Sequence, residues 1–544
     1  MAGFGSAALW IALAAALVAL VAYLTAVGGN EGGRRLGRLA FVLSTLGVVV
    51  ASALLLVAFH RSRFDIQYVA DYSARNLPAL YRVSAFWAGQ EGSFLLWALL
   101  GALMGLVLLR KAGEWEATVM PVFTAAQAYL LLLLVMKNPL RPAAEVHADG
   151  HGLNPLLQDP WMAIHPPMIF LGYAALAIPF AFAVAALLRR DYDRWVVRAL
   201  PWTLFAWVAL GAGIFIGGYW AYRVLGWGGY WGWDPVENAS LIPWLICTAL
   251  IHGMLLQRTR ASLKRGNLLL AIGAFTMVLY GTFLTRSGVL KDFSVHSFAD
   301  PGKALYTVLF AGILLALFAP LALLLRRVRE IQTGVTYDNL LSRDFAFFLG
   351  ILVVCISAAL VTFGTSAPIF TRGQMSPQPG YYNVTHFPVG VLLALLVGLA
   401  PLLAWRQIEA PALLRRLWGP AAVGIAAVIL AVGLGVHQRN AWMLLLVGAA
   451  AFALFADLAA TLRALRTQPL SSGGHLAHVG LALMLIGIVG SSVCSRAEKV
   501  SLAPGQSAQA LGYQVTYRGH TRPDESRRHL RLTLAKGGRE FEAE

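Results

Sequence analysis

Long apolar runs separated by short polar stretches dominate residues 1–492, and each run holds about 17 or more residues. The fourteen runs lie at 6–28, 39–60, 93–109, 119–136, 167–187, 200–217, 239–256, 267–285, 305–325, 345–364, 386–404, 417–436, 442–462 and 474–492. None contains Lys or Arg, and Asp457 is the one acidic residue inside them. Runs of this length cross a bilayer as α-helices, so the pattern predicts an all-α polytopic membrane protein with about 14 transmembrane helices.

The pattern changes after residue 492. Residues 493–544 alternate apolar and polar positions in YQVTY (513–517) and HLRLTLA (529–535), with Gly and Pro between them. Alternation with a period of two is typical of strands with one buried face. We therefore expect two domains, a transmembrane bundle at 1–492 and a small β domain at 493–544.

The charge distribution orients the bundle. The chain carries 43 Lys and Arg against 26 Asp and Glu, a net charge of +17. Basic residues are about three times as dense in one alternate set of loops as in the other, and such loops face the cytoplasm. The N-terminus, the longer aromatic loops and the β domain are then expected outside the cytoplasm. Because much of the excess positive charge is explained by the membrane topology, a nucleic-acid partner is not expected.

The cysteines supply no chemistry of their own. Cys247, Cys355 and Cys494 lie in or beside apolar runs, and no CxxC pair occurs among them. The sequence therefore predicts no metal ribbon, no redox dithiol and no haem-attachment CxxCH motif in this chain.

Residues 226–245, GWGGYWGWDPVENASLIPWL, form a tryptophan-rich loop on the expected outer side. Its aromatic residues alternate with glycines and are followed by an aspartate: Trp227, Tyr230, Trp231, Trp233 and Asp234. Glycines allow close approach to a flat object, and indole rings supply apolar area with one polar edge. The loop predicts a binding platform for a large planar ligand such as a haem, a quinone or a carotenoid. The alternative is an aromatic belt that anchors helices at the membrane interface.

The histidines fall at two depths. His165 and His296 lie in outer loops on either side of the tryptophan loop in the chain, where two imidazoles can hold a haem iron. His252 and His478 lie within spans of opposite direction, at matching depth near the cytoplasmic side. Intramembrane ionisable residues are candidates for function, and this pair suits a buried haem b. His475, one turn before His478, is an alternative ligand.

The other histidines and Asp457 are not expected to take part in the function. The remaining histidines, His386 among them, lie mostly at loops or span ends and are expected to be ordinary interfacial residues. Asp457 lies within two turns of its helix end, so its carboxylate is expected to snorkel to the nearer surface.

Several segments together resemble the haem-handling proteins that carry a WWD signature, and among these the CcmF family of cytochrome c maturation. They are YRVSAFWAGQEGSFLLWALL (81–100), GLNPLLQDPWMAIHPPMIFLGY (152–173), the tryptophan loop, GTFLTRSGVLKDFSVHSFADP (281–301) and AHVGLAL (477–483). They occur in the family's order over most of residues 80–500. Tyr230 and Gly232 depart from the bulkier aromatics of many relatives. The family's β domain is followed by a further span, so we expect 493–544 to be incomplete.

The resemblance implies a role for each site residue. His252 and His478 become the axial ligands of an integral haem b, with the AHVG pattern selecting His478. His165 and His296 become extracytoplasmic ligands of a second haem, which is the transferred substrate. The aromatic residues of the tryptophan loop and its aspartate become the platform on which that haem lies.

The resemblance also implies a reaction and partners. It predicts a haem lyase in the bacterial cytoplasmic (inner) membrane that joins haem vinyl groups to the CxxCH thiols of apocytochrome c. The expected partners are a CcmE-like haem chaperone, a CcmH-like thiol-handling protein, a quinol as electron donor, and membrane lipid. The alternative is a haem transporter or carrier of the same superfamily that forms no bond.

Overall fold

The structure is a computed structural model that describes residues 1–544 except 226–228, 291–301, 372–373, 437–440, 495–497, 499, 525–526 and 544. Its long helices are α1 (Ala2–Val27), α2 (Glu31–His60), α5 (Gln90–Lys111), α6 (Glu116–Met136), α7 (Pro160–Arg189), α8 (Trp195–Val224), α9 (Pro235–Arg260), α10 (Lys264–Arg286), α11 (Lys303–Arg327), α12 (Arg343–Phe370), α13 (Pro379–Leu399), α14 (Ala410–Gly433), α15 (Ala441–Thr467) and α16 (Ser472–Cys494). Two short helices, α3 (Gln67–Tyr72) and α4 (Ala79–Ser84), lie between α2 and α5.

The membrane-spanning pattern predicted from the sequence is confirmed. Fourteen helices in the described part of the chain are long and apolar enough to cross a bilayer. The helices extend beyond the apolar runs at several ends, because polar caps and basic residues continue the helix into the interface. The helix α7, for example, begins at Pro160, where the side chain of Asp159 accepts a hydrogen bond from the Trp161 amide.

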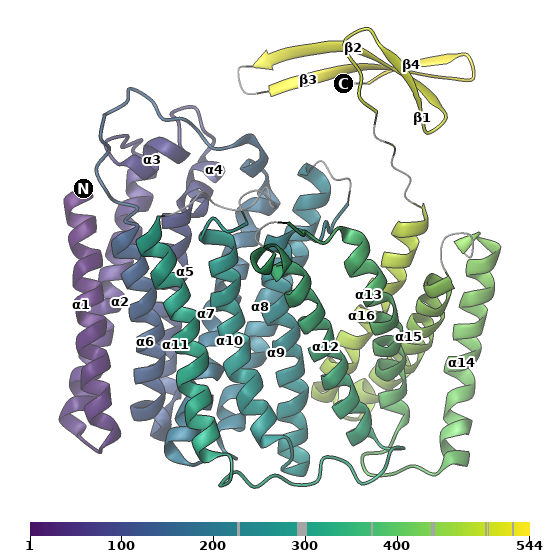
Figure 1. The fold of residues 1–544 in the computed structure, drawn as a ribbon, viewed down its shortest axis with the longest axis horizontal. Helices are drawn as coiled ribbons and strands as arrows, with labels where there is room; N and C mark the ends of the chain where they lie inside the picture. The colour runs from purple at the N-terminus through teal and green to yellow at the C-terminus, as the bar shows by residue number, and fades with distance from the viewer. Residues whose placement is uncertain are drawn as a thin grey trace.

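The helices form two lobes that meet at α9 and α12. One large apolar core joins α1, α2 and α5–α11, and smaller cores join α13–α16. A separate cluster links Ala249 and Leu256 of α9 to Ile351 and Val354 of α12. Figure 1 shows this order from the purple N-terminal lobe to the yellow-green C-terminal helices. Helix α9 therefore lies at the seam between the lobes.

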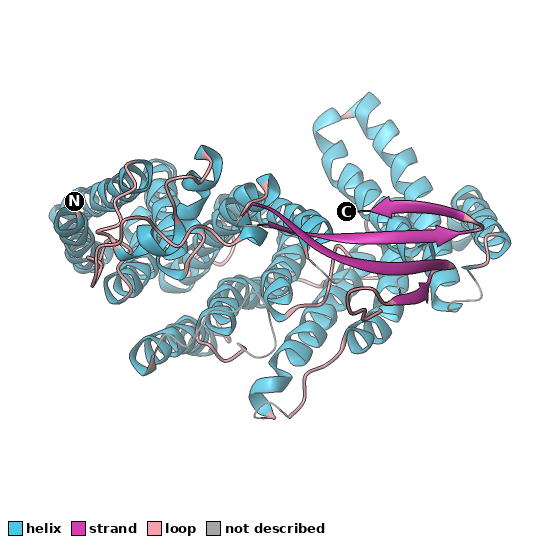
Figure 2. Ribbon diagram, turned by 90° about the horizontal axis from the view of Figure 1, so that it is seen from above, coloured by secondary structure: helices cyan, strands magenta, loops and turns pink. Residues whose placement is uncertain are grey.

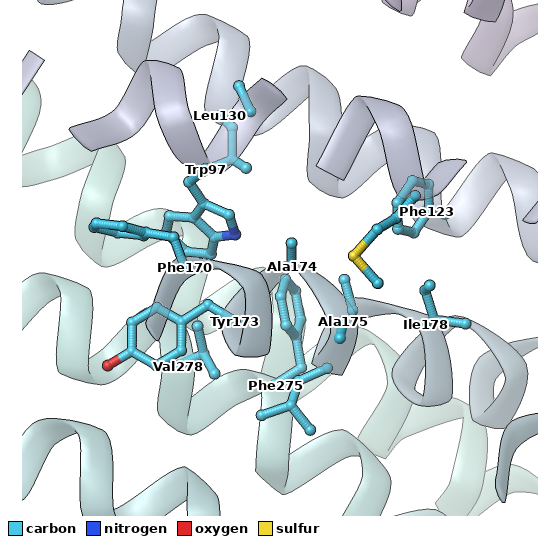
Figure 3. Packing of buried hydrophobic residues seen from close by; sticks show 14 of the residues in the cluster. Trp97, Phe123, Leu130, Phe170, Tyr173, Ala174, Ala175, Ile178, Phe275 and Val278 are labelled. Atoms are coloured by element: carbon cyan, nitrogen blue, oxygen red, sulfur yellow. The ribbon is translucent and has the colours of Figure 1, made fainter. Parts of the chain in front are cut away.

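Aromatic residues fill the centre of the first lobe. Trp97 of α5 packs against Phe170 and Tyr173 of α7, with ring centroids 6.2 and 5.7 Å apart. Figure 3 shows these side chains with Phe123 of α6 and Phe275 of α10 around them. Burial of such large rings from several helices holds α7 rigidly, which fixes the neighbours α8 and α10.

Helices α7 and α8 approach each other closely at Gly172. A Cβ added there would lie 2.6 Å from the Cβ of Leu210 and 2.8 Å from its Cα and amide nitrogen. Overpacking against the backbone costs about 1–3 kcal/mol of stability. This cost exceeds the stability that alanine gains over glycine from its higher helix propensity. We expect Gly172→Ala to lower the thermal midpoint in detergent. Gly273→Ala on α10 is the control, because nothing lies within 4 Å of its added Cβ; equal midpoints for both variants would contradict this packing.

The C-terminal segment forms one antiparallel sheet in the order β1-β2-β3-β4. Its strands are β1 (Ser507–Ala510), β2 (Tyr513–Asp524), β3 (Arg527–Lys536) and β4 (Arg539–Ala543). The turns at Leu511–Gly512 and Gly537–Gly538 have positive φ at both positions, as two-residue hairpins require. The predicted combination of a helical bundle and a small β domain is confirmed.

The sheet lies beyond the same end of the bundle as the N-terminus, α3 and α4 (Figures 1 and 2). We call this end the sheet end and the opposite one the far end. Helix α9 runs from the sheet end to the far end, and α16 returns from the far end to the sheet end.

Candidate functional site

The tryptophan loop leads directly into α9 through a capping box. The Asp234 side chain accepts a hydrogen bond from the Val236 amide (2.8 Å). Glu237 Oε2 accepts from the amides of Gly232 (2.9 Å) and Asp234 (3.2 Å). These bonds satisfy amides at the helix start and fix the path of the loop. Asp234 therefore shapes the predicted platform by anchoring it to α9.

Trp233 is held in a strained and well-defined position. Its φ of 56° lies in the left-handed region, which costs a non-glycine residue about 1–2 kcal/mol. Its Nε1 donates to Asn383 Oδ1 (3.0 Å), and its ring stacks on Tyr382 with centroids 4.8 Å apart and planes 8° apart. Its carbonyl accepts from the Asn238 side chain (3.2 Å). The surroundings thus fix both the backbone and the ring.

The rest of the described loop continues this aromatic surface. Trp231 meets Trp233 edge to face at 6.0 Å. The Tyr230 hydroxyl lies 3.2 Å from Ser491 Oγ on α16. The loop therefore contacts α13 through Trp233 and α16 through Tyr230, which joins both lobes at the sheet end. Trp227 lies outside the described residues.

His386, expected to be an ordinary interfacial residue, lies against this surface. Its ring is 5.3 Å from that of Trp233 and tilted by 42°. Its Nδ1 donates to the Tyr382 carbonyl (2.9 Å), and its Nε2 lies 3.1 Å from Ser357 Oγ. The signal in the sequence was the spacing of four between Tyr382 and His386, which puts both residues on one face of a helix.

Of the two histidines expected at the outer side, the structure describes only His165. His165 was expected on a loop before its span, and this is wrong: it lies in the second turn of α7, since that helix begins at Pro160. Its Nδ1 donates to the Gly213 carbonyl on α8 (2.7 Å), and its ring is nearly parallel to that of Trp220 at 6.5 Å. His296 lies outside the described residues.

His252 and His478 come together across the seam between the lobes. Their ring centroids are 6.1 Å apart and their planes differ by 8°. His252 Nδ1 donates to the Thr248 carbonyl at 2.8 Å, and Phe347 of α12 flanks its ring at 5.5 Å. The two histidines lie toward the far end, about 27 Å along α9 from its cap at Asp234 (eighteen residues).

Asp457 was expected to snorkel to the surface, and this is wrong. Its side chain is fully buried, and its Oδ1 lies 3.2 Å from His475 Nδ1 and 3.5 Å from His478 Nδ1. Two histidine partners on α16 hold the carboxylate inside the bundle, where the apolar pattern of α15 alone could not reveal them. His475 is thus a neighbour of the carboxylate, while the ring parallel to His252 is that of His478.

Comparisons with known proteins show which family this chain is similar to. A family model described as cytochrome C assembly protein matches residues 87–290. The cytochrome c-type biogenesis protein CcmF of Escherichia coli (strain K12) is 36% identical over 94% of this chain and 81% of its own. Its namesake from Pseudomonas fluorescens is 36% identical over 89% of this chain and 75% of its own.

A solved structure of a cytochrome c haem lyase CcmF covers 99% of this chain and 86% of its own, with 28% identity and a TM-score of 0.76. This chain is therefore similar to these proteins over nearly all of its length. The matched length includes the fourteen spans, the tryptophan loop and the paired histidines. The chain belongs to the CcmF family of cytochrome c biogenesis proteins.

Proposed function

We propose that this protein is a haem lyase with two haem sites, one at each end of α9. The single observation that carries the proposal is the pair formed by His252 and His478, whose rings are parallel and 6.1 Å apart. At the other end of the same helix lies the aromatic surface around Trp233. One helix thus connects a site suited to a resident haem with a surface suited to a substrate haem.

The geometry at the far end fits a haem b. His252 and His478, with parallel rings and centroids 6.1 Å apart, would be the residues that hold its iron. His252 Nδ1 is engaged by the Thr248 carbonyl, and His478 Nδ1 lies near Asp457, so Nε2 of each ring is the nitrogen available for iron. When bound there, haem b supplies one-electron redox chemistry. The residues Phe347 and Trp405, 5.6 Å apart, provide an apolar wall beside His252.

At the sheet end the chain positions a substrate haem. The described platform residues are Tyr230, Trp231, Trp233 and Asp234, and we include Trp227 from the resemblance. Fixed rings present an apolar face without losing much conformational freedom on binding. His165 and His296 are proposed to bind the substrate's iron, which orients its vinyl groups toward the incoming thiols.

The bond-forming step needs no nucleophile from this chain. Each cysteine thiol of a CxxCH motif adds across one vinyl group: the sulfur bonds to one vinyl carbon and the proton goes to the other. Two thioethers form with no net oxidation and no leaving group. The chain's residues hold the substrate, orient it and exclude water from it.

The proposed orientation places the sheet end outside the cytoplasm of a bacterium. The denser basic residues then lie in cytoplasmic loops, as membrane topology requires. Membership of a cytochrome c maturation system implies partners in that pathway. We propose a CcmE-like haem chaperone and a CcmH-like thiol-handling protein with apocytochrome c at the sheet end, and a quinol as the electron donor to haem b.

Product chemistry separates the lyase from a haem carrier. The chain is co-expressed with a CxxCH acceptor in a host whose own CcmF gene is deleted, and haem is extracted with acid and acetone. A lyase is expected to leave most of the acceptor's haem unextractable, and an SxxSH acceptor is the matched control. If all haem on the CxxCH acceptor can be extracted while the acceptor accumulates, the chain is a carrier.

A further inference from the structure

The buried carboxylate of Asp457 is an unusual feature of the second lobe. It is the one acidic residue within the apolar runs of the sequence, and its side chain has no exposed surface. Burying a carboxylate in a bilayer-spanning bundle costs several kcal/mol unless polar partners compensate. An ionisable residue buried in the membrane-spanning part of a protein is therefore a candidate for a function.

Its neighbours are two imidazoles on the adjacent helix. Asp457 Oδ1 accepts from His475 Nδ1 at 3.2 Å and lies 3.5 Å from His478 Nδ1. Its other oxygen, Oδ2, is buried and has no hydrogen-bond partner among the described residues. The carboxylate is therefore directed at these two histidines.

We propose that Asp457 is a positioning residue that holds the imidazole of His478 in line with His252 and lowers the reduction potential of the haem b between them. The proposal rests on the proposed haem b ligation. Histidines that bind metals usually donate their second ring nitrogen to a carboxylate or carbonyl, which fixes the ring and strengthens its basicity. Asp457 Oδ1 lies 3.5 Å from His478 Nδ1 and can take this role for His478, whereas the Thr248 carbonyl accepts from His252 Nδ1 at 2.8 Å.

The two proposed ligands therefore have different partners at their Nδ1 atoms. His252 donates to a neutral carbonyl of its own helix, whereas His478 faces a carboxylate from α15. In a medium of low dielectric constant, a nearby negative charge favours the ferric over the ferrous iron, because the ferric form carries one more positive charge. The carboxylate therefore makes the bound haem a stronger reductant.

His475 donates the hydrogen bond to the carboxylate. By binding Oδ1 it keeps the side chain of Asp457 turned toward α16, so that His478 meets the same oxygen. In this arrangement His475 supports the carboxylate and leaves the iron to His478.

The test is the reduction potential of haem b in Asp457→Asn, measured by spectroelectrochemistry on the purified full-length protein together with haem content and the low-temperature EPR spectrum. Asparagine keeps the shape and removes the charge. We expect at least a tenfold change in the ferric-to-ferrous preference, which for one electron is about 60 mV toward positive potential. Asp344→Asn is the matched control, since Asp344 is also a fully buried carboxylate but pairs with Arg260.

A haem-loaded Asp457→Asn protein with the potential and EPR spectrum of the parent would overturn the proposal. If the asparagine variant does not hold haem, Asp457→Glu is expected to restore both haem and low potential, and its failure to do so counts against the role. Retention of all haem by His478→Ala would instead contradict the ligand assignment, so the two failures are distinguishable.

Discussion

Replacing either His252 or His478 by alanine is expected to remove most of the haem b from the purified protein. The two imidazoles come from different lobes, and their parallel rings lie at a spacing that one iron can bridge. If both rings hold the haem as proposed, loss of one would leave a single imidazole to bind it. Haem per chain, measured from the pyridine haemochrome, should fall strongly in both variants, while the thermal midpoint of the protein shows that the fold persists.

The neighbouring histidine provides the control for this prediction. His475 is one helical turn from His478 and shares its carboxylate, yet it is not expected to bind iron. The variant His475→Ala should keep its haem. If it loses haem and His478→Ala does not, the ligand lies one turn earlier on α16.

The second large effect is expected at the sheet end. The variants His165→Ala and His296→Ala should each strongly lower covalent cytochrome c assembly and leave the spectrum of haem b unchanged. The two proposed haem sites would lie near opposite ends of the bundle, so removing one of two ligands would weaken capture of the substrate haem alone. His60→Ala, which alters an exposed histidine at the end of α2, is the matched control.

Added imidazole is expected to restore part of the assembly in these two variants, because a small ligand can occupy the vacated position. Assembly is quantified as haem-stained cytochrome c relative to the acceptor polypeptide. Normal assembly in both His165→Ala and His296→Ala would show that these residues do not bind the substrate haem.

Much of the fold could be predicted from the sequence, because each span and strand is encoded by its own local pattern. The apolar runs marked the fourteen spans, and the alternation at 513–517 and 529–535 falls within β2 and β3. The matching depth of His252 and His478 also followed from counting residues along helices of opposite direction. Their proximity agrees with that count.

What the sequence could not predict depends on how helices rotate and pair. Asp457 appeared as an isolated charge near a helix end, and only the packing of α15 on α16 reveals its histidine partners. In the sequence His386 is the first residue of an apolar run and was expected to lie at the membrane interface. In the structure it lies within α13, and its ring is next to that of Trp233. Likewise, Trp233 has a left-handed backbone, and it bonds to Asn238, five residues away, and to Asn383, 150 residues away. The pattern of apolar and polar positions predicts none of these features.

The mass of the acceptor is the most direct test of the lyase function. The acceptor is isolated under denaturing conditions from cells in which this chain replaces the host's CcmF, and its intact mass is measured. The account predicts a polypeptide heavier by one haem, with both CxxCH cysteines blocked to alkylation, and no such adduct when the chain is omitted. An acceptor of apoprotein mass with two free cysteines, in cells where the chain is loaded with haem b and its partners are present, would contradict it.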